Sequence, residues 1–223
     1  MKQLGSAIRA VLMAGLISAS SLSFTATSHA AAQAETLGPN IVNNGGFERG
    51  ADPGPMLDLM PGTPYLAGWN TLSDQVRVIG TYWQAQEGTR SLSLRNPRST
   101  SPNAIQKPGA VAQTLTTTPG QKYRVVLYQG ANPFDHRPSV LRVAIGGTTH
   151  DFTYQSDNKA SRTAMEWVKR TFIYAATSAS TRLVLTAQFT MSNNPLGMDN
   201  VQVRAIQGAS SNPSQASPTA TQP

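Results

Sequence analysis

The chain has 223 residues and no cysteine, so disulfide bonds and thiol chemistry are excluded. Its formal net charge is +7, but the basic residues are scattered and do not form a stripe with interleaved aromatic residues. We therefore expect no nucleic-acid partner, because such partners require clustered positive charge.

The N-terminal 34 residues are typical of a secretory signal peptide. Two basic residues precede a short apolar run at 10–22, and small-residue cleavage patterns end at Ala30 and Ala34. The run is too short and too rich in serine to remain as a stable membrane span. We expect an exported protein whose mature chain does not span a membrane, and the absence of cysteine favours a bacterial source.

Short segments with alternating apolar and polar residues recur along the rest of the chain. This alternation predicts half-buried strands, and no segment has a competing helical period. The Gly146-Gly147 dipeptide separates two of these segments and predicts a β-hairpin. Many short strands with frequent turns predict an all-β sandwich or barrel. The expected strands cover residues 75–79, 91–95, 111–115, 123–129, 140–145, 148–154, 167–175, 182–189 and 201–206.

Two segments, 51–64 and 96–108, contain several prolines each. Proline cannot donate to a β-ladder, so we expect surface loops rather than central strands there. The tail at 207–223 consists mainly of serine, proline, glutamine, alanine and threonine. It lacks apolar residues to dock and is expected to be disordered. One folded domain is therefore predicted over residues 35–206.

Three carboxylates stand beside a glycine or turn and next to an expected strand: Glu48, Glu87 and Asp199. Calcium prefers several oxygen ligands from carboxylates and backbone carbonyls. If the first and last strands of a sandwich lie together, Glu48 and Asp199 meet and can hold a hard cation. The residues leave a second interpretation open, in which these carboxylates cap turns or pair with arginines.

Several motifs occur in an order that resembles the choice-of-anchor C proteins of bacteria and the related plant cell-wall domain of unknown function 642. The resemblance covers residues 38–206 and implies a single-domain, galactose-binding-like jelly roll, as in carbohydrate-binding modules. The motifs are Asn40-Ile41-Val42-Asn43-Asn44-Gly45-Gly46-Phe47-Glu48, then Gly68-Trp69, then Ile79-Gly80-Thr81-Tyr82-Trp83-Gln84-Ala85-Gln86-Glu87-Gly88, and finally Met198-Asp199-Asn200-Val201.

The resemblance also implies a structural calcium ion. In many such modules the ion joins a glutamate of the first strand, a glutamate and a carbonyl of an early loop, and an aspartate of the last strand. Carried over to this chain, the ligands are Glu48, Glu87, the Arg90 carbonyl and Asp199, with the Gly46 carbonyl as a further donor.

Aromatic residues are the remaining candidates for ligand binding. Stacking on a sugar requires an exposed ring with polar groups nearby. Tyr82 and Trp83 are consecutive, so in a strand one is expected to be buried and the other exposed. For each candidate, a structural role at a loop rim remains the alternative. The candidates are Trp83, Tyr82, Tyr65 and Tyr128, with Gln129 and Asn132 as hydrogen-bonding partners.

The sequence shows no catalytic constellation, and we do not expect an enzyme. The predicted function is an exported, non-catalytic module that binds carbohydrate, with a polysaccharide or cell-envelope glycan as its partner. This step from fold to function is an analogy. Two alternatives remain: a structural envelope or matrix protein that contacts other proteins, and a hydrolase with an unrecognised site.

Overall fold

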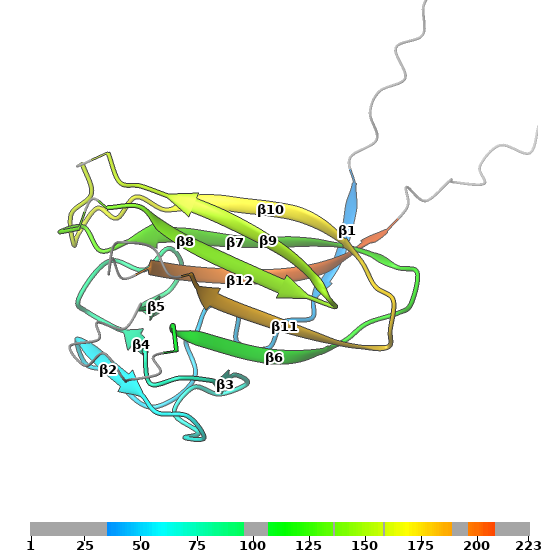
Figure 1. Ribbon diagram of the computed structural model, residues 1–223, viewed down its shortest axis with the longest axis horizontal. Helices are drawn as coiled ribbons and strands as arrows, with labels where there is room; N and C mark the ends of the chain where they lie inside the picture. Colours follow the sequence, from blue (N-terminus) through cyan, green and yellow to red (C-terminus); the bar gives the residue numbers. More distant parts are fainter. Residues whose placement is uncertain (1–34, 96–106, 136, 158, 189–195, 208–223) are drawn as a thin grey trace, which may run out of the picture. The chain divides into compact units, whose positions relative to one another are not determined.

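The computed structural model describes residues 35–95, 107–135, 137–157, 159–188 and 196–207 (Figure 1). The expected signal peptide, most of the second proline-rich segment and the tail from residue 208 lie outside these ranges. The described residues form strands and no helix, so no helix among them has the length and apolar character of a membrane span. The strands are β1 (Thr36–Asn40), β2 (Met56–Leu59), β3 (Asn70–Thr71), β4 (Val76–Ile79), β5 (Ser91–Leu94), β6 (Ala110–Thr116), β7 (Lys122–Ala131), β8 (Ser139–Ile145), β9 (Thr148–Tyr154), β10 (Val168–Ala175), β11 (Ser180–Ala187) and β12 (Leu196–Gln207).

The strands form two antiparallel sheets, which confirms the predicted all-β sandwich of the jelly-roll type. The first sheet has the order β10-β7-β12-β5-β4-β2, with β1 also paired to β12, and the second has the order β3-β6-β11-β8-β9. Apolar side chains from both sheets form one core, including Leu127 and Val203 from the first sheet and Val111 and Leu185 from the second.

The alternation seen in the sequence corresponds to the two faces of the strands. In β8 the side chains of Leu141, Val143 and Ile145 are fully buried, while the residues between them are partly exposed. Each such buried aliphatic side chain stabilises the fold by about 1.5–3 kcal/mol relative to an exposed one. The predicted hairpin is also confirmed, because β8 and β9 pair antiparallel across Gly146-Gly147, and both glycines have positive φ.

The expectation that residues 51–64 form only a loop is wrong. Within this segment β2 pairs with β4 and forms an edge of the first sheet. Pro55 precedes β2 and Pro61 follows it, so the prolines lie outside the strand. An edge strand also tolerates neighbouring prolines because one of its sides needs no ladder partner.

The first and last strands lie together, which is the arrangement that a meeting of Glu48 and Asp199 requires. β1 pairs with the end of β12, with Thr36 opposite Gln207 and Asn40 opposite Arg204. β5 pairs with the beginning of the same strand. Between these two pairings β12 contains a bulge, where Asn200 adopts a φ of 49°. Asparagine tolerates this left-handed conformation better than most residues do.

Candidate functional site

The Gly-Gly dipeptide of the first motif packs directly against the bulge of β12. The carbonyl of Gly45 accepts a hydrogen bond of 2.9 Å from the amide of Val201. A Cβ atom on Gly45 would lie 2.0 Å from the carbonyl oxygen of Val201, whereas a Cβ on Gly46 would meet nothing closer than 3.8 Å. Glycine is therefore required at position 45, and this close approach brings Glu48 beside the last strand.

Asp199 lies on the bulged part of β12 and is 0 % exposed. Its Oδ2 atom accepts hydrogen bonds from the amides of Gln86 at 2.8 Å and Glu87 at 3.1 Å. Its Oδ1 atom accepts one from the amide of Asn200 at 2.7 Å. The carboxyl group of the last strand therefore holds the loop that follows β4.

Burial raises the pKa of Asp199 to about 7. Loss of solvation is the largest cause, the three backbone hydrogen bonds oppose it, and the negative charge of Glu48 raises the pKa further. Among the described residues, no lysine or arginine forms an ion pair with Asp199. The site thus contains a buried carboxyl group whose negative charge is not compensated by a basic side chain.

Glu48 holds the other side of the same loop. Its Oε1 atom accepts hydrogen bonds from the amides of Thr89 at 3.0 Å and Arg90 at 2.9 Å, and its Oε2 atom accepts one from the Thr89 hydroxyl at 2.9 Å. Gly88 has a φ of +66°, and a Cβ atom there would lie 2.3 Å from Oε1 of Glu48. We call residues 86–90 the anchored loop, because two carboxylates fix its backbone.

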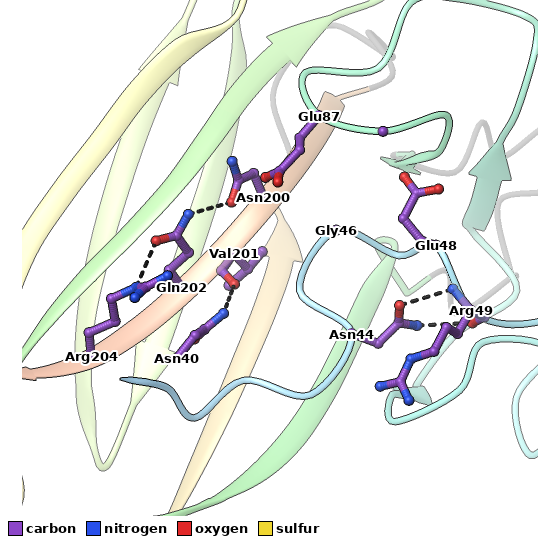
Figure 2. A pocket seen from close by; sticks show the side chains of 11 residues that line it. Asn40, Asn44, Gly46, Glu48, Arg49, Glu87, Asn200, Val201, Gln202 and Arg204 are labelled. Atoms are coloured by element: carbon purple, nitrogen blue, oxygen red, sulfur yellow. Dashed lines mark hydrogen bonds between the residues drawn. The ribbon is translucent and has the colours of Figure 1, made fainter. Parts of the chain in front are cut away.

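The five predicted metal ligands do not all converge. Glu48 and Asp199 both contact the anchored loop, and Gly46 lies beside them. Figure 2 shows the exposed Glu87 carboxylate turned toward Asn200, away from Glu48. The predicted donor of Arg90 is its backbone carbonyl, and the Arg90 backbone lies beside Glu48 through its amide, while its guanidinium donates to the carbonyl of Ala51 at 3.1 Å. Of the five, Gly46, Glu48 and Glu87 line a pocket of about 540 Å³, together with Asn40, Asn44, Arg49, Gly88, Asn200, Val201, Gln202 and Arg204.

The contacts of Glu48 and Asp199 are of the turn-capping kind that the sequence left open beside metal binding. In the part of the chain that the structure describes, no group of three or more histidine, cysteine, aspartate or glutamate side chains gathers as a metal site. A cation at this position would therefore take a large share of its ligands from backbone carbonyls. Such an all-oxygen donor set, with a buried uncompensated carboxyl group, fits calcium better than a transition metal.

The segment just before the anchored loop carries the two consecutive aromatic candidates. Trp83 is 3 % exposed, and its indole nitrogen donates to the Ser91 hydroxyl at 2.8 Å. Tyr82 is half-buried and its ring packs near that of Trp83, with centroids 5.7 Å apart. Tyr82 is thus the ring of this pair that reaches the surface.

Two residues without a signal among the sequence motifs, Arg162 and Phe134, lie near Tyr82, and Arg162 contacts both rings. The guanidinium of Arg162 is 4.2 Å from the centre of the Tyr82 ring and 4.9 Å from that of Phe134. Phe134 is 64 % exposed, and its turn is fixed by Asn132, whose Oδ1 accepts from the Phe134 amide at 3.1 Å. The Asn-Pro-Phe order in a turn is a sequence signal that could have indicated this exposed ring.

We define the loop surface as Tyr82, Phe134 and Arg162 with the adjoining pocket. The pocket has a volume of about 540 Å³. Because Gly88 lines both this pocket and the one bordered by Glu48, the anchored loop separates the two. The residues lining the pocket of the loop surface are Gly80, Thr81, Tyr82, Trp83, Gln84, Ala85, Gly88, Thr89, Arg162 and Thr163.

The remaining ligand candidates do not line this pocket. Gln129 is fully buried, accepts a hydrogen bond from Arg170 and donates to the carbonyl of Phe152, so its role in these contacts is structural. Tyr128 is half-buried and lies opposite Asp199 on the neighbouring strand. Tyr65 is 44 % exposed and follows the prolines of the first irregular segment.

Comparison with known proteins gives one family and several similar folds. The family model described as "Protein of unknown function (DUF642)" matches residues 40–204. Halomucin from Haloquadratum walsbyi is 26 % identical over an alignment of 172 residues, with a coverage of 74 % of this chain and 2 % of halomucin, so the chain spans a small part of that protein.

Similar solved structures include TmCBM61 in complex with β-1,4-galactotriose, at 13 % identity and a TM-score of 0.45 over 74 % of this chain and 97 % of that chain. The CBM22-1 xylan-binding domain of Paenibacillus barcinonensis Xyn10C is 21 % identical, with a TM-score of 0.42 over 69 % of this chain and 94 % of that chain. Family 16 Carbohydrate Binding Module-2 is 15 % identical, with a TM-score of 0.43 over 74 % and 99 %. Similarity of this degree does not determine what the chain binds.

Proposed function

Since the chain belongs to the DUF642 family, a family described as of unknown function, we propose a function from the geometry of its site. The protein is a non-catalytic module that binds a polysaccharide at the loop surface. The partner we propose is an exported polymer or a glycan of the bacterial cell envelope, in keeping with the signal peptide expected at the N-terminus.

The observation that carries this proposal is that aromatic rings and polar groups lie side by side at the loop surface, next to the anchored loop. Phe134 is 64 % exposed and Tyr82 reaches the surface, so both offer apolar ring area beside the Arg162 guanidinium, and the adjoining pocket is lined by residues with hydroxyl and amide groups, among them Gln84 and Thr163. A pyranose ring offers both an apolar face and hydroxyl groups, so this combination suits it.

Rigidity of the support favours binding, because a pre-ordered surface loses little conformational entropy when a ligand docks. Tyr82 stands on the buried Trp83, and the loop beyond it is held by the Glu48 and Asp199 carboxylates. We propose that these two carboxylates serve the function indirectly, by fixing the backbone that carries the binding ring.

We further propose a structural calcium ion beside the anchored loop. Glu48 and Asp199 would hold it together with the carbonyls of Arg90 and Gly46, and Glu87 would join after its side chain turns. When bound, the ion supplies the positive charge that the buried Asp199 lacks. The protein residues themselves orient the loop, through the hydrogen bonds already described.

Binding of the purified protein to a panel of soluble and insoluble polysaccharides tests the proposed function. We expect at least one polysaccharide to be retained, and Tyr82→Ala to weaken that binding about tenfold or more. Tyr65→Ala is the matched control, since this tyrosine is exposed but lies outside the pocket. Capture of envelope proteins alone, or release of new reducing ends from a polysaccharide, would contradict the proposal and support a structural protein or a hydrolase instead.

A further inference from the structure

Arg162 is held differently from other arginines in the described residues. A typical arginine of this chain donates to an oxygen atom, as Arg77 does to the Asp58 carboxylate at 2.7 Å. The guanidinium of Arg162 instead lies over the rings of Tyr82 and Phe134. Within the described ranges, no carboxylate, amide or carbonyl oxygen accepts a hydrogen bond from it.

Hydrogen bonds fix the backbone around Arg162, and this defines where its side chain leaves the backbone. Ser161 and Ala164 exchange two backbone hydrogen bonds, at 3.0 and 3.3 Å, which close a tight turn around Arg162. The carbonyl of Arg162 accepts a hydrogen bond of 2.7 Å from the amide of Gln84. The turn is thereby attached to the same segment that carries Tyr82.

Stacking on an aromatic ring restricts a guanidinium but leaves the N–H groups at its edge free to donate. These donors form a planar fork that matches the two oxygens of a carboxylate. Arg162 therefore combines two features of an anion-binding side chain: its plane is supported by protein rings, and its hydrogen-bond donors have no partner within the described residues.

The charges around Arg162 favour an anion. The residues that line the pocket of the loop surface include no aspartate or glutamate, so Arg162 is the charged residue among them. Glu87, next to the lining residue Gly88, turns its carboxylate toward Asn200 (Figure 2). Asp135, next to Phe134, forms an ion pair with an arginine. The chain has a formal charge of +7 and stays basic without the two basic residues of the expected signal peptide, and this positive charge also attracts acidic polymers.

We propose that the loop surface recognises acidic polysaccharides, with Arg162 pairing with the carboxylate of a uronate residue while Tyr82 and Phe134 contact the sugar face. This inference rests on the proposed function and makes it specific. Carboxylated and sulfated sugars share the negative charge that Arg162 would bind. The planar fork can pair with two oxygens of either group, so the experiment includes both and distinguishes them.

The test measures affinity for a matched set of polymers by isothermal titration calorimetry. Alginate is the polyuronate probe, and its propylene glycol ester has the same backbone with its carboxylates neutralised. Mannan is the neutral probe and dextran sulfate the sulfated one. We expect alginate to bind about tenfold or more tightly than its ester. We also expect this preference to decrease as salt is added, because screening weakens pairing between exposed charges.

Two variants with the same change in charge separate local recognition from general attraction. Arg162→Gln removes the guanidinium of the loop surface. Arg182→Gln removes another exposed arginine, on β11 in the second sheet, whose side chain also has no hydrogen-bond partner within the described residues. Both side chains are exposed, so neither variant removes a core contact. We expect Arg162→Gln to lower alginate affinity about tenfold or more, and Arg182→Gln to change it less than about twofold.

The outcomes distinguish this inference from the function on which it rests. If the ester or mannan binds as tightly as alginate, or if the two variants behave alike, the inference is wrong while carbohydrate binding stands. If dextran sulfate alone binds, a sulfate site replaces the uronate site. If no polymer of the panel binds, both proposals fail.

Discussion

Asp199 makes the stability of the domain depend on pH in a direction opposite to that of most carboxylates. Its pKa is raised from 3.8 to about 7 by burial, so the folded state binds the proton more tightly than the unfolded state does. The stabilisation from this group is fully present below the pKa that Asp199 has in the unfolded state. It is lost as pH rises through the pKa that Asp199 has in the folded state. At about 1.4 kcal/mol per pH unit, the unfolding free energy falls by about 3 kcal/mol between about pH 5 and about pH 8.

Denaturant titrations at several pH values in this window, with a chelator present, measure the effect. The carboxyls with a lowered pKa, Asp58, Asp151 and Asp157, lose their stabilisation only at lower pH and do not interfere. Asp199→Asn should remove most of the pH dependence, because the amide does not titrate. Asp52→Asn is the matched control: Asp52 also accepts a backbone hydrogen bond, from Gly54 at 3.0 Å, but it is exposed.

Calcium adds a second arm to the same experiment. If the ion binds beside Asp199 as proposed, it compensates the buried charge, and saturating calcium should abolish the loss of stability toward about pH 8. An unfolding free energy that does not fall between about pH 5 and about pH 8 in chelator would refute the argument from burial. A fall that persists unchanged in saturating calcium would refute the proposed metal site and leave the burial argument standing.

Three further predictions concern the anchored loop and the glycines around it. Gly45→Ala should lower the unfolding free energy by about 3 kcal/mol or more in denaturant titrations, because its Cβ overlaps the backbone of the last strand. Gly46→Ala should lower it by less than about 1 kcal/mol. Equal effects of the two variants would contradict the close approach of Gly45 to Val201. Gly88→Ala should be more destabilising than Gly120→Ala, since both have positive φ but only the first displaces a carboxylate. Glu48→Ala should cost about 1 kcal/mol and speed amide exchange in the anchored loop, and unchanged exchange would show that another contact holds it.

The sequence was sufficient for most of the fold, because alternation is a local signal. The predicted strand at 148–154 matches β9 residue for residue, and the predicted strand at 91–95 differs from β5 by one residue at its end. β2 was missed because prolines argue against a central strand but not against an edge strand, and the sequence does not show that β2 lies at an edge. β3 has two residues, too few for a period to appear.

The candidate site was predictable only in part. The sequence motifs singled out Glu48 and Asp199, and in the structure both carboxylates hold the anchored loop from its two sides. The direction of the Glu87 side chain depends on the backbone of a loop, which no periodicity describes. Arg162 and Phe134 come from separate turns, and the position of Arg162 over the rings of Tyr82 and Phe134 is a tertiary juxtaposition that neither segment indicates by itself.

The pairing of β1 with β12 determines how the domain would respond to mechanical force. Thr36 lies opposite Gln207 in an antiparallel pair, so the chain enters and leaves the described domain at the same end of one ladder. Tension between these two ends would break the hydrogen bonds between β1 and β12 one after another, beginning at Thr36 and Gln207, and so separate β1 from the sheet. The next contacts in line would be those of Gly45 and Val201, and then the anchored loop. Tension applied between one chain end and a ligand on the loop surface would not pull the two chain ends apart in this way. The architecture is therefore better suited to tethering through a single end than to bearing load between both ends.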